Sequence, residues 1–234
     1  MNTHLPVPLK LPKIVSASNP GAVGLAAATL KRGGVVALPT DTVYGLAAAI
    51  DQPRAIAQLF AIKKRPDGKP IPILVSCTAN LSRLSSGLST IERGLAERFW
   101  PGALTLVVSA APDLPESLTS TEADGQRTVA VRLPDHPLAI AIIQAAGGAL
   151  AVTSANYSDE WPALNALQVL QLSSPHPDLI VDGGPVSGAI ASTIVRMGRS
   201  RLEILRHGPI TASELTVLMR DLHHGEPTFR VGAV

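Results

Sequence analysis

Short apolar runs alternate with amphipathic stretches along almost the whole chain. Runs rich in valine, isoleucine and leucine predict buried strands, whereas apolar positions that repeat every three or four residues predict helices. On this pattern we expect strands at 14–16, 35–38, 71–76, 104–109, 128–133, 149–153, 179–181, 192–197 and 202–205. We expect helices at 20–32, 52–63, 91–99, 137–146, 165–172 and 211–220.

Capping and helix-breaking residues mark the expected ends of two of these helices. Asn19 followed by Pro20 predicts an N-cap and a first helical residue, and Gly33-Gly34 predicts the end of the same helix. Thr211 and Glu214 have the spacing of a capping box at the start of the last helix.

The alternation of strands and helices predicts an α/β fold with an open twisted sheet and flanking helices. Too few residues separate the strands expected at 192–197 and 202–205 for a crossover helix, so the sheet should be mixed. No internal repeat or linker interrupts the pattern. This favours one domain over residues 13–220, with tails at 1–12 and 221–234.

The composition constrains the core, the partners and the compartment. Hydrophobic residues make up 46% of the 234 residues and aromatic residues only 3%, so small aliphatic side chains must fill the core. The single cysteine, Cys77, ends an apolar run, and we expect a buried, inert thiol. A net charge of +2 does not indicate a general nucleic-acid binder. No apolar run approaches the ~20 residues of a membrane span, so we expect a cytoplasmic protein without membrane contact.

Several polar segments do not fit an ordinary core or an ordinary surface. They combine hydroxyl, amide, carboxylate and cationic side chains with glycine and proline, and most follow a predicted strand. The segments are 39–46 (PTDTVYGL), 63–70 (KKRPDGKP), 152–156 (VTSAN), 182–184 (DGG), 191–195 (ASTIV) and 205–208 (LRHG). Taken singly, each also fits a turn or a helix cap, and that reading stays open for any one of them.

Together the segments supply groups that hold and neutralise anions at strand ends, where open α/β sheets commonly bind ligands. They contain no Ser/His/acid order, no glycosidase-type carboxylate pair and no metal-ligand spacing. No Walker-type or G-x-G-x-x-G loop occurs, so side chains would have to hold a nucleotide. This inventory suits phosphoryl or nucleotidyl transfer, in which positioning and charge stabilisation carry catalysis.

In this order, the segments resemble the YrdC-type threonylcarbamoyl-AMP synthases. The resemblance spans roughly residues 14–210, and no single stretch decides it. The matching stretches are PTDTVYGL (39–46), KKRP (63–66), PGALTLV (101–107), TVAVRLPDHP (128–137), TSAN (153–156), DGG (182–184), STIV (192–195) and LRHG (205–208). The chain departs from the family at Ser158-Asp159-Glu160, where members often have Ser-Gly and where two carboxylates would lie near a phosphate site.

The resemblance implies a YrdC-like fold with a concave, positively lined cavity, and it implies the reaction performed there. Threonine and bicarbonate give a carbamate, which attacks the α-phosphorus of ATP to form L-threonylcarbamoyl-AMP and pyrophosphate. Mg²⁺ would enter on the ATP phosphates, with no metal ligand from the protein. A downstream transferase would then move the threonylcarbamoyl group to adenosine in tRNA.

The resemblance also implies ligand contacts at matching positions. The contacts expected for ATP are Lys63, Arg65, Thr128, Asn156 and Arg206. Those expected for threonine are Thr40, Arg132, Ser154 and Ser192. Lys63 and Arg65 would stabilise phosphate charge and Arg132 would clamp the threonine carboxylate, with no residue acting as a nucleophile.

Two other functions stay open at this point. The same concavity would suit a non-catalytic module that binds double-stranded RNA or contacts tRNA weakly, although scarce aromatic residues argue against stacking on bases. It would also suit the carbamoyl-adenylate-forming domain of a hydrogenase-maturation carbamoyltransferase. The absence of acylphosphatase-like or zinc-finger-like flanking sequence argues against that reading.

Overall fold

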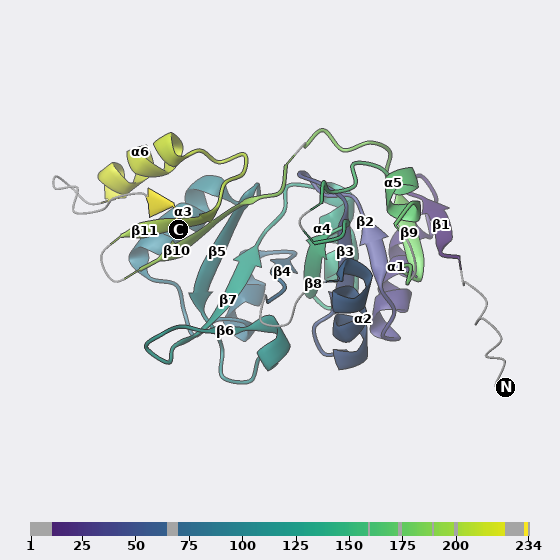
Figure 1. The fold of residues 1–234 in the computed structure, drawn as a ribbon, viewed down its shortest axis with the longest axis horizontal. Coiled ribbons are helices and arrows are strands. Elements are labelled where there is room, and N and C mark those ends of the chain that lie inside the picture. The colour runs from purple at the N-terminus through teal and green to yellow at the C-terminus, as the bar shows by residue number, and fades with distance from the viewer. Residues whose placement is uncertain are drawn as a thin grey trace, which may run out of the picture.

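Figure 1 shows the computed structural model of the chain, which describes residues 11–64, 70–158, 160–172, 175–188, 190–198 and 201–222 and the backbone of 232–233. The strands are β1 (Lys13–Ser16), β2 (Val36–Leu38), β3 (Gly45–Ala49), β4 (Ile73–Val75), β5 (Leu104–Ser109), β6 (Ser120–Thr121), β7 (Arg127–Arg132), β8 (Ala149–Ser154), β9 (Leu179–Asp182), β10 (Thr193–Met197), β11 (Leu202–Arg206) and β12 (Gly232–Ala233). The helices are α1 (Ala22–Lys31), α2 (Pro53–Lys63), α3 (Thr90–Phe99), α4 (Pro137–Ala145), α5 (Ala166–Leu170) and α6 (Ala212–Leu222), with 3-10 helices η1 (Thr78–Arg83) and η2 (Glu116–Leu118).

The described strands form one mixed sheet in the order β1-β9-β2-β3-β8-β4-β7-β5-β10-β11-β12, with β6 paired to β7. The pairs β1–β9, β2–β9, β4–β7, β5–β10 and β11–β12 are parallel. The other pairs are antiparallel, including the β10–β11 hairpin that the short connection predicts. The predicted open, mixed α/β sheet is therefore confirmed.

Every helix and strand expected from the sequence is present, with its ends within two residues of the prediction. Strand β3 was missed because its sequence, GLAAA, consists largely of residues that are depleted in strands. It forms because β2 and β8 pair with it on both sides and all five of its residues are buried. Here tertiary pairing overrides local preference.

Two local predictions are wrong, and a third is confirmed. Helix α1 begins at Ala22, because Asn19 Oδ1 accepts a hydrogen bond from Gly21 N at 2.8 Å and forms a turn ahead of the helix. Cys77 is exposed, since β4 ends before it and the thiol lies at the start of η1. The capping box of Thr211 and Glu214 is present, with reciprocal bonds of 2.8 and 3.2 Å.

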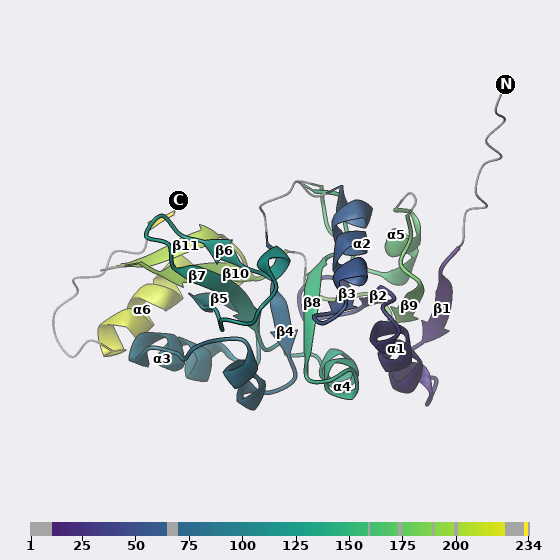
Figure 2. The same ribbon diagram turned by 90° about the horizontal axis from the view of Figure 1, so that it is seen from below.

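The two faces of the sheet are covered differently. One face carries a continuous apolar core under α2, α3, α5 and α6, and α3 and α6 lie side by side at the end of the molecule far from β1 (Figures 1 and 2). On the other face, α1 and α4 pack together over β9, β2, β3 and β8 (Figure 2). Beyond α4 this second face continues over β4, β7, β5 and β10, and there it bears the cavity described below. Within the described residues, no helix has the length and apolarity needed to cross a membrane.

Candidate active site

A cavity of about 420 Å³ lies on this second face of the sheet. Its walls come from the loop before β3, the segment before β4, and strands β4, β5, β7, β8, β10 and β11. Its volume lies within the range of pockets that hold small molecules.

The cavity gathers predicted site residues from distant parts of the chain. Those that line it are Thr40, Thr128, Arg132, Ser154, Ser192 and Arg206. Lys63 and Asn156 lie beside it and are hydrogen-bonded to Ser154. Arg65 lies outside the described residues. The predicted residues are therefore brought together, and the ligand that each contacts stays a prediction.

Alternation along two neighbouring strands brings polar side chains into the cavity. On β7, Val129 and Val131 belong to the apolar core, whereas Thr128 and Arg132 line the cavity. On β5 the same alternation places Thr105, a residue that the sequence analysis missed, in the cavity wall. A lone threonine within an otherwise apolar strand was the available signal.

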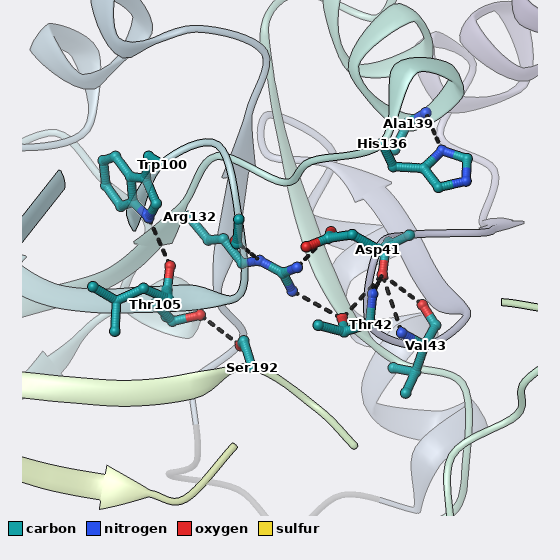
Figure 3. A network of polar contacts seen from close by, with 12 residues as sticks. Asp41, Thr42, Val43, Trp100, Thr105, Arg132, His136, Ala139 and Ser192 are labelled. Carbon is teal, nitrogen blue, oxygen red and sulfur yellow. Dashed lines mark hydrogen bonds and ion pairs between the residues drawn. The ribbon is translucent and has the colours of Figure 1, made fainter. Parts of the chain in front are cut away.

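Three neighbours hold the guanidinium of Arg132 in a fixed orientation (Figure 3). Its Nε donates to Gly102 O at 2.8 Å, its Nη1 to Thr42 Oγ1 at 3.0 Å, and its Nη2 to Asp41 Oδ1 at 2.5 Å. Burial lowers the pKa of Arg132 and the Asp41 carboxylate offsets part of that effect; arginine still remains charged. Because a guanidinium has five N–H groups, two are left for a ligand.

The hydroxyl of Thr40 shapes the loop that carries Asp41. Its Oγ1 donates to Val43 O at 2.6 Å and accepts from the backbone N of Thr42 and of Val43, each at 3.2 Å. Because its one proton is taken by Val43 O, Thr42 is the donor in the 3.1 Å contact between the two hydroxyls. Thr42 thus joins Thr40 to Arg132, a role that the sequence analysis did not assign to it.

His136 lies beyond Asp41 and begins helix α4 (Figure 3). Its Nδ1 accepts from Ala139 N at 3.4 Å. Burial lowers the pKa of His136, and the Asp41 carboxylate acts in the opposite direction. A neutral imidazole is consistent with the accepting Nδ1 at this N-cap.

Ser192 and Arg206, which the sequence analysis assigned to different ligands, are directly bonded to each other. Arg206 Nη2 donates to Ser192 Oγ at 3.1 Å, and Arg206 Nε donates to Ser192 O at 3.0 Å. Ser192 Oγ also lies 2.8 Å from Thr105 Oγ1 (Figure 3). The hydrogen-bonded series Thr105–Ser192–Arg206 therefore links β5, the residue before β10, and β11.

Lys63 is buried, with 2% of its surface exposed, and it ties α2 to the loop after β8. Its Nζ donates to Asn156 Oδ1 at 2.6 Å and to Ser154 O and Oγ at 2.9 and 3.2 Å. Asn156 Nδ2 donates in turn to Glu160 O at 2.6 Å. The buried Ser158 Oγ has no hydrogen-bond partner among the described residues.

Thr128 belongs to a charged cluster at the opposite side of the cavity. Its Oγ1 donates to Glu122 Oε1 at 3.3 Å, and Arg196 Nη1 lies 2.5 Å from Glu122 Oε2. Arg196 also pairs with Glu203 at 2.6 Å, and Arg201 pairs with the other Glu203 oxygen at 3.1 Å. The hydrogen bond to Glu203 raises the pKa of Arg196, and the reciprocal bond lowers the pKa of Glu203. The sequence analysis singled out neither Glu122 nor Arg196, although both line the cavity.

Tyr44 fixes the DGG segment against the loop before β3. Its hydroxyl donates to Gly184 O at 2.8 Å and accepts from Gly183 N at 3.1 Å. Burial raises the pKa of Tyr44, so the phenol stays protonated and can donate. Four residues further on, Gly188 passes directly over Thr42: a Cβ atom at Gly188 would lie 2.0 Å from Thr42 O.

We expect Gly188→Ala to disturb the site without touching a ligand. The added methyl group overlaps Thr42 O, so one of the two backbones must move. Overpacking of this kind costs about 1–3 kcal/mol. Thermal unfolding would show the lower stability. Gly87→Ala is a suitable comparison, because its positive φ strains the backbone while no heavy atom lies within 4 Å of the new Cβ. An unfolding temperature that falls no further in Gly188→Ala than in Gly87→Ala would contradict the expectation.

The family model described as "Telomere recombination" (Sua5, YciO, YrdC) matches residues 28–208 of the chain. Threonylcarbamoyl-AMP synthase of Bacillus subtilis is 34% identical over 206 residues, which is 88% of this chain and 59% of that protein. A putative threonylcarbamoyl-AMP synthase of Mycobacterium tuberculosis is 34% identical over 194 residues, 83% of this chain and 87% of that protein. The chain thus spans somewhat over half the length of the first relative and most of the second.

Solved structures show the same fold. Pyrococcus abyssi Sua5 in complex with L-threonine superposes with a TM-score of 0.82 at 29% identity, covering 95% of this chain and 62% of that one. Escherichia coli YciO superposes with a TM-score of 0.75 at 22% identity, covering 87% of this chain and 98% of that one. The similarity to YciO, at 22% identity, is evidence for the fold alone.

Proposed function

Since this chain belongs to the Sua5/YciO/YrdC family, we propose that it makes L-threonylcarbamoyl-AMP from L-threonine, bicarbonate and ATP. Relatives named threonylcarbamoyl-AMP synthase and the threonine-bound Pyrococcus abyssi structure support the proposal. The observation that carries it is one cavity in which Arg132 lies with the hydroxyls of Ser154 and Ser192.

We assign the threonine carboxylate to Arg132. Arg132 lines the cavity and keeps two N–H groups beyond its three protein contacts, and a charged guanidinium donor suits a carboxylate. Thr42 and Asp41 keep the guanidinium from rotating, so little ordering is needed when the amino acid binds. Ser192, on the same wall, would add a hydroxyl contact.

The proposed chemistry needs positioned charge more than a reactive side chain. The threonine amine attacks bicarbonate, giving a carbamate and water. A carbamate oxygen then bonds to the α-phosphorus of ATP, and the bond to the β,γ-pyrophosphate breaks. Arg206 lines the cavity and would stabilise the developing charge, as a donor fixed before the reaction does. Ser154 lines the same cavity, and its hydroxyl donates to Asn156 Oδ1.

Mg²⁺ would enter with ATP in this proposal. Within the described residues there is no cluster of three His, Cys, Asp or Glu side chains that would hold a metal ion. Asp41 and Glu122 are each paired with an arginine. The ion would therefore take most of its ligands from phosphate and water, as Mg²⁺ commonly does, and would neutralise phosphate charge.

We further propose that the product serves threonylcarbamoyl modification of adenosine in tRNA. An acyl-adenylate is an activated intermediate, so a second enzyme must use it, and a threonylcarbamoyl-transferase is the partner that fits its chemistry. Direct contact with tRNA would be weak, in keeping with the near-neutral net charge of +2.

The alternative functions have less support. A non-catalytic RNA-binding module gives no reason for a guanidinium buried to 5% exposure and held in a closed network. A carbamoyl-adenylate-forming domain shares this fold, but two relatives that match over 87% of their own length are named "Putative threonylcarbamoyl-AMP synthase".

The proposal predicts pyrophosphate release that depends on threonine. Purified protein would be incubated with ATP, Mg²⁺, bicarbonate and radiolabelled threonine, and pyrophosphate and the labelled adenylate would be measured. We expect both products in equal amounts, and neither when bicarbonate is removed. Pyrophosphate that forms equally well without threonine would rule out the proposed function.

A further inference from the structure

Thr105 is a buried polar residue at the centre of the sheet. It lies on β5, which pairs with β7 on one side and with β10 on the other. Its neighbours Leu104 and Leu106 belong to the apolar core, whereas Thr105 lines the cavity with 1% of its surface exposed. A hydroxyl buried to this extent needs a hydrogen-bond partner, because an unpaired polar group destabilises the fold.

The Ser192 hydroxyl is that partner (Figure 3). The two oxygens lie 2.8 Å apart, and among the described residues the Thr105 hydroxyl bonds no other group. Thr193, which follows Ser192, is in register with Leu104, and its N donates to Ala103 O at 3.0 Å. The contact between the two hydroxyls is therefore fixed by the pairing of β5 with β10.

Arg206 limits how the Ser192 hydroxyl can be used. Its Nη2 donates to Ser192 Oγ at 3.1 Å, and a guanidinium can only donate. Since a hydroxyl has one proton and two lone pairs, Ser192 is left with its proton and one lone pair. If Ser192 donated to Thr105, the Thr105 proton would have no acceptor among the described residues. If Thr105 donates, the Ser192 proton is left over instead, on the more exposed residue of the two, at 4% against 1%.

We propose that Thr105 is a positioning residue that makes Ser192 a hydrogen-bond donor to the amino-acid substrate. This inference rests on the proposed function. Thr105 and Arg206 occupy both lone pairs of Ser192 Oγ, so the Ser192 proton points into the cavity and bonds an oxygen of threonine.

The direction of these protons also orients the substrate. Ser192 keeps no lone pair for an N–H donor, so the threonine amine is not accepted at this wall, whereas an oxygen is. The amine is thereby directed away from Ser192 and Arg206 and stays free to react with bicarbonate. Thr105 has this effect through Ser192, without contacting the substrate itself.

The test is a double-mutant cycle on the dissociation constant of L-threonine, measured by isothermal titration without ATP or bicarbonate. Thr105→Val keeps the shape of the side chain and removes its hydroxyl, and we expect about 3- to 10-fold weaker binding, the value of one hydrogen bond. Ser192→Ala should weaken binding at least as much. Thr105→Val added to Ser192→Ala should change the affinity by less than about two-fold, since no Ser192 proton is left to direct.

Two further variants separate positioning from a general effect of losing a hydroxyl. Thr105→Ser keeps the donor, and it should bind threonine within about two-fold of the parent protein. Thr29→Val is the control, because the Thr29 hydroxyl donates to Leu25 O within α1 and does not line this cavity. It should leave the affinity for threonine unchanged in both the parent and the Ser192→Ala background.

Equal losses from Thr105→Val in the parent and in Ser192→Ala would show that Thr105 acts independently of Ser192, and would overturn the inference. Parent-like affinity in Thr105→Val would overturn it too. Far-UV circular dichroism would confirm folding, and if Thr105→Val does not fold, Thr105→Ala takes its place in the cycle with the same expectations. A parent protein that binds no threonine would overturn both proposals, whereas an additive cycle with threonine-dependent pyrophosphate release intact would overturn this inference alone.

Discussion

Arg132→Lys is expected to reduce kcat/KM for threonine by at least about 100-fold, the cost of losing a fixed charged donor in an active site. Lysine keeps the positive charge, but it cannot offer two parallel N–H groups to a carboxylate while also bonding Gly102, Thr42 and Asp41. Most of the loss should appear as a higher KM for threonine, because ground-state and transition-state binding both use the carboxylate. The KM for ATP should change much less.

The same substitution should also lower stability. At least one of the acceptors that Arg132 now serves would be left buried without a donor, at a cost of about 1–3 kcal/mol. Thermal unfolding would separate this effect from the catalytic one. Arg201→Lys is the control, because Arg201 is 57% exposed in its ion pair with Glu203. It is expected to change neither the KM for threonine nor the unfolding temperature measurably. An Arg132→Lys enzyme with the parent's KM for threonine would show that another group binds the carboxylate.

The sequence was most informative about helices and strands, and least informative about which side chains contact one another. Strands and helices could be predicted because apolar periodicity and caps are local properties, as the capping box of Thr211 and Glu214 shows. Strand β3 could not, since its residues favour a strand only when β2 and β8 flank it. The predicted helix start at Asn19 and Pro20 was wrong. The Asn19 side chain accepts from Gly21 N and closes a turn, so the helix begins only at Ala22.

The site shows the same division. The motifs identified most of the residues that meet in the cavity, because each motif stands out from its surroundings in composition. The motifs did not show that the Thr40 hydroxyl donates to Val43 O within its own turn. Nor did they show that Arg206 donates a hydrogen bond to Ser192. Glu122 was missed because nothing in its local sequence distinguishes it, and its ion-pair partner Arg196 lies 74 residues away.

Coupling between the proposed substrates follows from these contacts. Arg206, expected at ATP, and Ser192, expected at threonine, share two hydrogen bonds. A ligand that displaces one of these two side chains would therefore also displace the other. Side chains whose positions are linked suit a reaction in which a carbamate oxygen must approach the α-phosphorus in line. Small displacements of the reacting groups lower the rate of such a reaction by large factors.

Lys63→Met is the second substitution expected to have a large effect, and it tests whether Lys63 acts on the loop after β8. Methionine fills a similar volume, but it leaves Asn156 Oδ1 and Ser154 O without the ammonium that now bonds them. We expect a loss of stability of about 1.5–3 kcal/mol from the lost charged hydrogen bonds, since Ser154 Oγ still donates to Asn156 Oδ1 and Asn156 N still donates to Ser154 O. Turnover should fall by about 100-fold or more, because Ser154 and Asn156 lose their positions.

The measurements that decide between a loop role and a direct phosphate role for Lys63 are the unfolding temperature without ligand and the affinity for ATP. Loss of the loop contacts lowers both, whereas loss of a phosphate contact alone lowers only the affinity. Lys64→Met is the control next in the chain: its ammonium lies 4.4 Å from the centre of the Tyr157 ring. A cation–π contact at an exposed site is worth about 0.5–1 kcal/mol, so this control should change stability little. A Lys63→Met protein with the parent's unfolding temperature would mean that the hydrogen bonds to Ser154 and Asn156 do not hold the loop. A lower affinity for ATP in that protein would then assign the ammonium to the nucleotide.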